Sequence, residues 1–141
     1  MTRHRLLCLS LLGILAAAAP QRLRAQAPAP PGVFVLSQNR CAYGTLSQLN
    51  ALVDTTVAPV LNELVAEGRL HGWGLLEHSW GDEWNWNLFY TATSHRAFLD
   101  AFDEFARRVS QRHPTAFERL VSYCTDHRDN IYGVHAMRMR S

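Results

Sequence analysis

Two aromatic-rich segments, residues 71–80 and 84–93, constrain the fold of this chain more than any other feature. Each is long enough for a strand and carries the large aromatic residues that strands favour. The Gly-Asp dipeptide between them suits a two-residue hairpin turn. With that turn, the numbers of paired residues sum to 163, so that Trp73, for example, faces Tyr90. The sequence therefore predicts an antiparallel hairpin near the middle of the chain.

Helical patterns lie on both sides of this hairpin. Residues 46–66 repeat apolar side chains every three or four positions, which predicts a helix that Pro59 kinks or splits near Ala58. After the hairpin, Ser94 is a favourable N-cap for a second helix that runs to about Arg112. A shorter helix is expected beyond the proline that ends this one.

The two ends of the domain supply the remaining strands. Residues 32–36 form an apolar run that predicts a strand through about Ser37, with Cys41 as its furthest end. The uninterrupted apolar character of this run predicts burial on both faces. Residues 126–130 are polar and typical of a turn, and residues 131–134 are expected to form the last strand.

The resulting element order is β-α-β-β-α-β, with one extra short helix before the last strand. This order predicts an α+β fold of the ferredoxin-like type, with the helices on one face of an antiparallel sheet. The other face then lacks a cover, and its aromatic content makes exposure costly. We therefore expect one domain over residues 32–136 that forms a homodimer through the uncovered face.

Three sequence stretches carry a resemblance to a known family. They are Val57-Ala58-Pro59-Val60-Leu61, the run Glu67-Gly68-Arg69-Leu70-His71-Gly72-Trp73-Gly74-Leu75, and the strand rich in Trp and Asn that follows. Over roughly residues 33–134 the chain resembles the dimeric α/β-barrel superfamily, and in particular uncharacterised secreted bacterial members. The resemblance implies ferredoxin-like protomers whose sheets pack together into a barrel. The superfamily includes cofactor-independent monooxygenases, haem-handling enzymes and isomerases.

Some oxygenases of this superfamily place a Trp, an Asn and a His or Arg around the substrate. The resemblance thus draws attention to residues of these types in the hairpin, namely Trp73, Asn85, Asn87 and His78.

The N-terminus is typical of a secretory signal. Arg3 and Arg5 precede an apolar stretch of about 14 residues, and small residues allow cleavage after Ala25. The alternative is an uncleaved membrane anchor, but the stretch is shorter than the roughly 20 residues that span a bilayer. The expected organisation is a signal peptide over residues 1–25, a Pro/Ala-rich tether over 26–31, the domain, and a frayed tail over 137–141.

Removal of the signal changes the charge of the chain. All 14 basic residues are arginines, and four of them lie within residues 1–25, which contain no acidic residue. The mature chain keeps ten arginines against 12 acidic residues, a formal net charge of −2. A mildly acidic domain with scattered arginines is not expected to bind nucleic acid or to stay inserted in a membrane after cleavage. We expect it in the periplasm or outside the cell.

Cys41 and Cys124 are the only cysteines of the mature domain. In an oxidising compartment such a pair favours a disulfide, which would close a loop of about 80 residues. Two buried free thiols and a thiol nucleophile remain the alternatives at this stage.

The hairpin gathers all four tryptophans of the chain and Tyr90. These rings can form the core and the dimer interface, or they can line an apolar site for an aromatic or polycyclic ligand. In the second case, the candidate ligand-binding residues are Trp73, Trp86, Asn85, Asn87 and Tyr90.

Two titratable side chains lie among these residues. Glu77, opposite Trp86 in the expected register, is a candidate general base if the rings desolvate it. It can equally reach solvent at a strand edge or pair with an arginine. His78 is a candidate acid or base, or an axial haem ligand, near Asn85 and Asn87. Its alternative is an ordinary hydrogen-bonded histidine.

Three functions are compatible with these features. The first is an exported barrel domain that binds a small apolar or aromatic ligand, the second is a cofactor-independent monooxygenase or isomerase, and the third is a structural module whose aromatic residues fill the dimer interface. None of them requires a cofactor, and haem is an option only through His78. No metal site is expected, because the Cys and His spacings match no zinc pattern. The absence of lysine excludes Schiff-base chemistry.

Overall fold

The computed structural model describes residues 31–78, 80–81 and 83–136. The expected signal, nearly all of the tether and the expected tail lie outside these residues. Four strands form one antiparallel sheet with the spatial order β2-β3-β1-β4. The strands are β1 (Val33–Cys41), β2 (Gly72–Glu77), β3 (Trp86–Ala92) and β4 (Cys124–Gly133).

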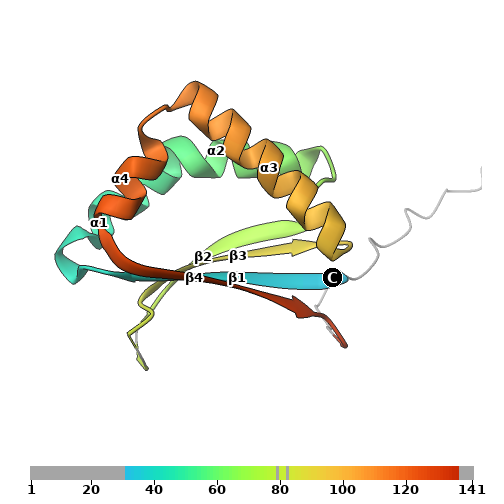
Figure 1. Ribbon diagram of the computed structural model, residues 1–141, viewed down its shortest axis with the longest axis horizontal. Helices are drawn as coiled ribbons and strands as arrows, with labels where there is room; N and C mark the ends of the chain where they lie inside the picture. The colour runs from blue at the N-terminus through green and yellow to red at the C-terminus, as the bar shows by residue number, and fades with distance from the viewer. Residues whose placement is uncertain (1–30, 79, 82, 137–141) are drawn as a thin grey trace, which may run out of the picture.

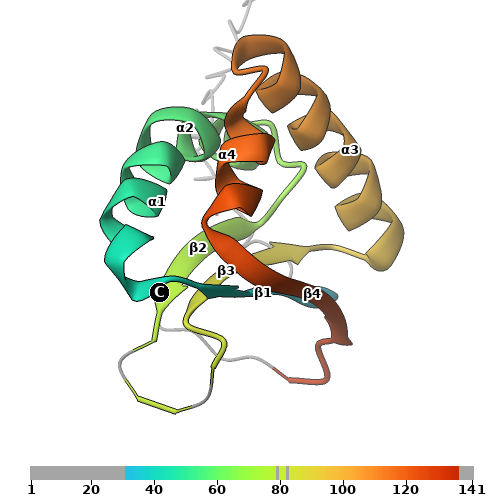
Figure 2. The same ribbon diagram turned by 60° about the vertical axis from the view of Figure 1, so that its left-hand side comes forward.

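All helices lie on one face of this sheet (Figure 1). They are α1 (Leu46–Leu52), α2 (Ala58–Ala66), α3 (His95–Arg112) and α4 (Ala116–Ser122), with a 3₁₀ turn over Tyr43–Thr45. The short α4 lies between α1 and α3 (Figure 2). The predicted α+β class, with helices on one face of an antiparallel sheet, is confirmed.

The register of the central hairpin is the predicted one. Trp73 pairs with Tyr90 and Glu77 pairs with Trp86, so paired numbers sum to 163 along the whole β2–β3 ladder. Both strands are shorter than predicted. Beyond them the backbone N–H of His78 still donates to the carbonyl of Asn85 over 3.0 Å. The expected turn at residues 81–82 includes a position outside the described residues.

The long N-terminal helix is interrupted as predicted, and the interruption is a π-turn over Val53–Val57. The backbone N–H of Ala58 bonds to the carbonyl of Val53, five residues earlier. The next residue, Pro59, has no N–H to donate, so an α-helical bond cannot form at that position. Helices α1 and α2 therefore follow one another with a local widening, an arrangement that often occurs at functional sites.

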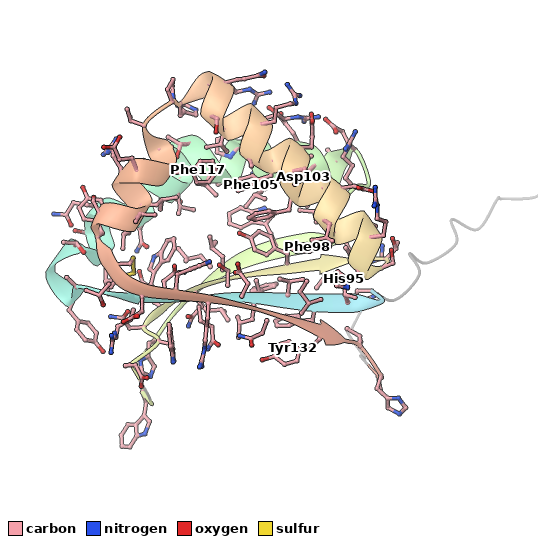
Figure 3. All side chains as sticks on the ribbon, in the orientation of Figure 1. His95, Phe98, Asp103, Phe105, Phe117 and Tyr132 are labelled. Atoms are coloured by element: carbon pink, nitrogen blue, oxygen red, sulfur yellow. A yellow bond between two sulfur atoms is a disulfide. The ribbon has the colours of Figure 1, made fainter. Side chains whose placement is uncertain are left out.

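The α3 helix begins as predicted, because the Ser94 side chain accepts a hydrogen bond from the backbone N–H of Ala97. Its apolar stripe packs toward the sheet, with Phe98, Phe105 and Val109 buried. Figure 3 shows Phe98 and Phe105 between α3 and the sheet, with Phe105 next to Phe117 of α4.

The prediction of a turn over residues 126–130 is wrong, because these residues belong to β4. The strand pairs with β1 from Val33 opposite Gly133 to Cys41 opposite Cys124. As an edge strand, β4 is exposed to solvent along one side, so polar side chains are tolerated there and are common. Polar composition alone therefore did not distinguish an edge strand from a turn.

The prediction that β1 is buried on both faces is also wrong. Val33, Val35 and Ser37 are buried toward the helices, whereas Phe34 and Leu36 on the opposite face are partly exposed. The reason is that none of the helices formed by the described residues covers that second face (Figure 1). We call this surface the open face; Tyr132 points into it, away from the helices (Figure 3).

Candidate functional site: a cavity between the sheet and the helices

A cavity of about 310 Å³ lies between the sheet and the helices. Its floor is formed by Trp86, Leu88 and Tyr90 of β3, and its roof includes aromatic rings of α3 and α4. The volume falls at the lower end of the range for small-molecule sites. The site is therefore large enough for one compact ligand.

Ring-to-ring contacts define the shape of the roof. Phe102 meets Tyr90 edge-to-face, with ring centroids 6.2 Å apart, and Phe105 meets Phe117 in the same way at 5.9 Å. Edge-to-face pairs are a favourable aromatic geometry and hold the rings in fixed orientations. The π-turn contributes as well, since its last residue, Val57, is fully buried and lines the cavity.

One side of the cavity is polar. Asn39 of β1 pairs with His127 of β4, and Ser37 pairs with Asp129, so these four side chains share the face that the helices cover. We call Ser37, Asn39, His127 and Asp129 the polar wall. Three of them, Ser37, Asn39 and His127, line the cavity directly.

The His127 ring is held on both sides. Nδ1 lies 2.9 Å from Oδ1 of Asn39, and Nε2 lies 3.0 Å from a carboxylate oxygen of Asp129. The imidazole is half exposed and both of its nitrogens are occupied, so it can exchange a proton with a bound molecule only when one of these contacts opens. The wall thus places one group capable of proton transfer beside the cavity.

Two hydroxyl groups of the cavity make no hydrogen bond to any described residue. They belong to Tyr90, whose side chain is 3% exposed, and to Ser37, which is 9% exposed. Burial raises the pKa of the Tyr90 phenol above its ordinary value, and the Asp129 carboxylate adds to this effect. Tyr90 therefore remains a neutral hydrogen-bond donor at physiological pH. Both oxygens are accessible from the cavity, so a molecule bound there can supply their hydrogen-bond partners.

Charged groups are scarce around the cavity. No arginine is among its described lining residues. Asp126, at the edge, forms an ion pair with Arg40, and Asp129 has His127 as its partner. The interior therefore offers hydroxyls and aromatic surfaces but no cation for an anionic ligand.

Several solved structures have the same fold. A dimeric ferredoxin-like protein from an uncultured marine organism superposes with a TM-score of 0.61 at 14% identity, over 77% of this chain and 91% of that one. A NIPSNAP family protein from Agrobacterium tumefaciens gives 0.58 at 15% identity, over 71% and 90%. The chain has a ferredoxin-like fold. The resemblance seen in the sequence is thus confirmed for the fold.

A third ferredoxin-like structure is provisionally named an antibiotic biosynthesis monooxygenase and comes from Nitrosomonas europaea. Its TM-score is 0.55 at 8% identity, over 74% of this chain and 99% of that one. At such identities, structural similarity establishes the fold and not the activity. No protein family model matches the sequence, and no curated protein matches it either.

The ferredoxin-like topology also explains the disulfide. Cys41 at the end of β1 and Cys124 at the start of β4 are opposite each other and form a disulfide bond, which confirms the predicted pairing. Cys124 lines the cavity next to the polar wall. The bond therefore joins the two strands that carry this wall.

Of the five predicted ligand-binding residues, Trp86 and Tyr90 line the cavity. Trp73 shares the helix-covered face but lies nearer α2, where its indole N–H donates to Oδ1 of Asn62 over 2.9 Å. Asn85 is buried, and its amide bonds both the N–H and the carbonyl of Cys41 at 2.8 Å. Asn85 thus holds the end of β1.

Asn87 lies outside the cavity lining. Its side chain accepts from the backbone N–H of Asn39 at 3.3 Å and donates to the carbonyl of Trp84 at 2.9 Å. These contacts connect the hairpin loop to β1.

The two predicted catalytic candidates also lie outside the cavity lining. Glu77 is exposed on the edge strand β2 and accepts a hydrogen bond from the side chain of Asn50. The other amide atom of Asn50, Oδ1, accepts from the Trp86 indole at 3.0 Å. Glu77 therefore reaches the cavity only indirectly, through residues that hold Trp86.

His78 follows β2 at the start of the hairpin loop. Its Nδ1 is buried with no hydrogen-bond partner in the described part of the chain. The ring lies against Gly81, where a Cβ would approach Nε2 to 2.8 Å. Since His78 does not line the cavity, the residues present do not fit a haem bound there through this histidine.

Two further properties concern the described residues only. No three His, Cys, Asp or Glu side chains among them gather closely enough to hold a metal ion. None of the helices they form is both long and apolar enough to cross a bilayer.

Sequence reasoning missed the polar wall. Its signal is the alternation of His127 and Asp129 at a spacing of two, which places both side chains on one face of a strand. That signal is visible only once residues 126–130 are assigned to a strand.

Proposed function

We propose that the chain is an exported domain that binds one small apolar or aromatic ligand in the cavity between the sheet and the helices. The observation that carries the proposal is an aromatic cavity of about 310 Å³ that Tyr90 and Ser37 line, two residues whose hydroxyls make no hydrogen bond to the described residues. The cavity is open to solvent beside the exposed Val121, so a ligand can enter it. For comparison, an apolar cavity of about 150 Å³ takes benzene. Twice that volume suits a molecule of two fused rings.

Export is supported by the N-terminal signal pattern and by the disulfide. A disulfide between the two cysteines of the mature domain is typical of proteins that fold in an oxidising compartment.

We further propose that the domain is a homodimer in which a second copy covers the open face. Phe34 and Phe89 stack on this face with ring centroids 5.5 Å apart, and Leu76 and Tyr132 are exposed beside them. A contiguous apolar surface of this kind is uncommon on a monomer. The ferredoxin-like protein from an uncultured marine organism is itself described as dimeric, which supports the same arrangement.

The distribution of the aromatic residues favours ligand binding over a purely structural role. Trp86 and Tyr90 lie on the helix-covered side and line the cavity, so they are separate from the surface that a second copy would cover. An interface module would need no such cavity.

The polar wall supports a second candidate function, a cofactor-independent monooxygenase or isomerase of the same fold. The observation behind it is the His127–Asp129 pair beside the cavity. In this case the bound molecule would replace Asn39 at Nδ1 of His127 and exchange a proton there, while Asp129 keeps the ring oriented through Nε2. Glu77 and His78 stay as candidates that substitution can test.

Binding of naphthalene to the mature protein, purified from an oxidising compartment, tests the first proposal. We expect saturable binding, followed by the NMR signal of the Trp86 indole N–H. The variant Leu120→Trp, which fills the cavity from α4, should abolish binding, whereas Leu99→Trp on the exposed side of α3 should retain it. Native mass spectrometry of the same sample reports the dimer and any ligand that co-purifies. The proposal would be contradicted if both variants lost naphthalene binding equally, or if the unmodified protein did not bind naphthalene.

A further inference from the structure

We infer that the cavity selects an uncharged aromatic molecule that carries a hydroxyl or carbonyl oxygen, and that the hydroxyl groups of Tyr90 and Ser37 bind this oxygen. The inference rests on the proposed ligand-binding function and specifies the chemistry of the ligand.

The first step is the placement of the two hydroxyls. Tyr90 of β3 pairs with Val35 of β1, and Ser37 of β1 pairs with Leu88 of β3. Tyr90 and Ser37 are therefore diagonal neighbours on adjacent strands and lie on the same face. Such neighbours are about 7–8 Å apart, a distance that long side chains bridge. One ligand oxygen near this part of the floor is within reach of both.

The second step is the lack of protein partners. Both side chains are at least nine-tenths buried, and neither hydroxyl bonds to any residue that the structure describes. By contrast, the other polar groups on this face are paired: the Trp86 indole with Asn50, and His127 with Asn39 and Asp129. The unsatisfied hydrogen-bonding capacity of the site is thus concentrated at Tyr90 and Ser37.

The third step concerns charge. A buried carboxylate needs a cation or several donors to offset its loss of hydration. The described lining holds no arginine, and the nearby carboxylates of Asp126 and Asp129 already have Arg40 and His127 as partners. An anionic ligand would therefore lose its hydration without gaining an arginine partner in the lining. A neutral hydroxyl or carbonyl needs only the donors and acceptors that Tyr90 and Ser37 supply.

The aromatic side chains of the roof determine which apolar group the ligand carries. Phe102, Phe105 and Phe117 present ring edges and faces toward the space above the floor, and Figure 3 shows Phe105 and Phe117 side by side there. Aromatic ligands gain both area burial and ring geometry in such surroundings.

Three bicyclic probes of similar size separate these contributions: naphthalene, 2-naphthol and 2-naphthoate. At neutral pH, isothermal titration of the mature protein should show 2-naphthol binding about two- to twelvefold more tightly than naphthalene, the gain expected from one neutral hydrogen bond. It should show 2-naphthoate binding most weakly of the three.

Substitutions then assign the effect to the hydroxyls. Tyr90→Phe should remove most of the advantage of 2-naphthol while naphthalene affinity stays within about twofold, and Ser37→Ala should act in the same direction. The matched control is Tyr43→Phe, at an exposed tyrosine of the 3₁₀ turn, which should change nothing.

Four results would overturn the inference. Tightest binding of 2-naphthoate would show that the site prefers anions. Equal affinities for naphthalene and 2-naphthol would show that the hydroxyls do not contribute, although the proposed function would stand. An equal loss of both ligands in Tyr90→Phe would show that the hydroxyl is structural. Failure of all three probes to bind would contradict the proposed function and the inference together.

Discussion

His127 Nε2 lies 3.0 Å from a carboxylate oxygen of Asp129, two residues further along the edge strand β4. The spacing of two places both side chains on the face that the helices cover. Asn39, opposite His127 on β1, holds the other ring nitrogen, so the imidazole is fixed from both sides at the border of the cavity. Proton transfer by His127 to a bound molecule therefore requires that the contact with Asn39 opens.

The first prediction separates an enzyme from a binding protein. If His127 acts as a base on a bound carbonyl compound, the protein should accelerate deuterium exchange at the α-carbon of 2-tetralone in D₂O, measured by NMR. His127→Gln should then reduce this acceleration by about 10²–10⁴-fold while 2-tetralone still binds. The control His95→Gln, at an exposed histidine that begins α3, should behave like the unmodified protein.

The same assay applied to Glu77→Gln and His78→Gln tests the candidates that the sequence indicated. If either variant loses the exchange activity while His127→Gln stays fully active, the catalytic group lies in the hairpin and not in the polar wall. No acceleration by the unmodified protein would argue against an isomerase and leave ligand binding as the function.

The second prediction concerns the disulfide between Cys41 and Cys124, which are 83 residues apart in the sequence. The double variant Cys41→Ser/Cys124→Ser should lose up to about 4–5 kcal/mol of unfolding free energy, because the unfolded chain regains the freedom of a long loop. Urea denaturation measures this loss. The unmodified protein in reducing buffer should show a similar decrease, and an unchanged urea midpoint in both samples would contradict the prediction.

Some features of the fold were predictable from local sequence signals. The β2–β3 register followed from period-two patterning around one turn, and the start of α3 followed from Ser94 as a cap. Both are local signals. The disulfide was predicted from the expected oxidising compartment and from the presence of two cysteines in the expected mature domain.

The polar wall could not be reached in the same way. Asn39 and His127 are 88 residues apart, and their contact depends on the pairing of β1 with an edge strand whose polar residues are typical of a turn. The cavity depends in turn on how α3 and α4 pack over the sheet. The spacing between these helices and the sheet is set by tertiary packing, and no local sequence pattern predicts it.

The third prediction concerns acid stability. Glu104 lies on α3 between Arg107 and Arg108, with its side chain 18% exposed, and hydrogen bonds from these arginines lower the pKa of its carboxyl from 4.5 to about 2. Because the folded-state pKa is lowered, the stabilisation is complete above about pH 4.5 and disappears as the pH falls toward 2. Glu63 of α2 forms an ion pair with Arg112, and Glu67, just after α2, forms one with Arg108; we call these pairs and those of Glu104 the ion-pair network. Hydrogen bonds from the same arginines lower the pKa of the Glu63 and Glu67 carboxyls as well.

The melting temperature should therefore fall between about pH 5 and pH 2, and Glu104→Gln should reduce both the stability at pH 7 and the steepness of that fall. Glu118→Gln on α4 is the control, and its profile should follow that of the unmodified protein. Since the network is largely at the surface, 1 M salt should weaken the effect. A Glu104→Gln profile that superposes on the unmodified one would contradict the prediction.

The fourth prediction tests the proposed dimer with two matched leucines. Leu76, on the open face, is 45% exposed, and Leu99, on the helix side of the molecule, is 44% exposed. A glutamate at either position meets solvent in the monomer, so neither substitution should unfold the domain. In a dimer that buries the open face, however, Leu76→Glu places two like charges in an apolar interface, which costs several kcal/mol. Sedimentation at micromolar concentration should show Leu76→Glu as a monomer and Leu99→Glu as a dimer. If both variants remain dimeric, the second copy binds elsewhere, and the apolar residues around Phe34 and Phe89 require another partner.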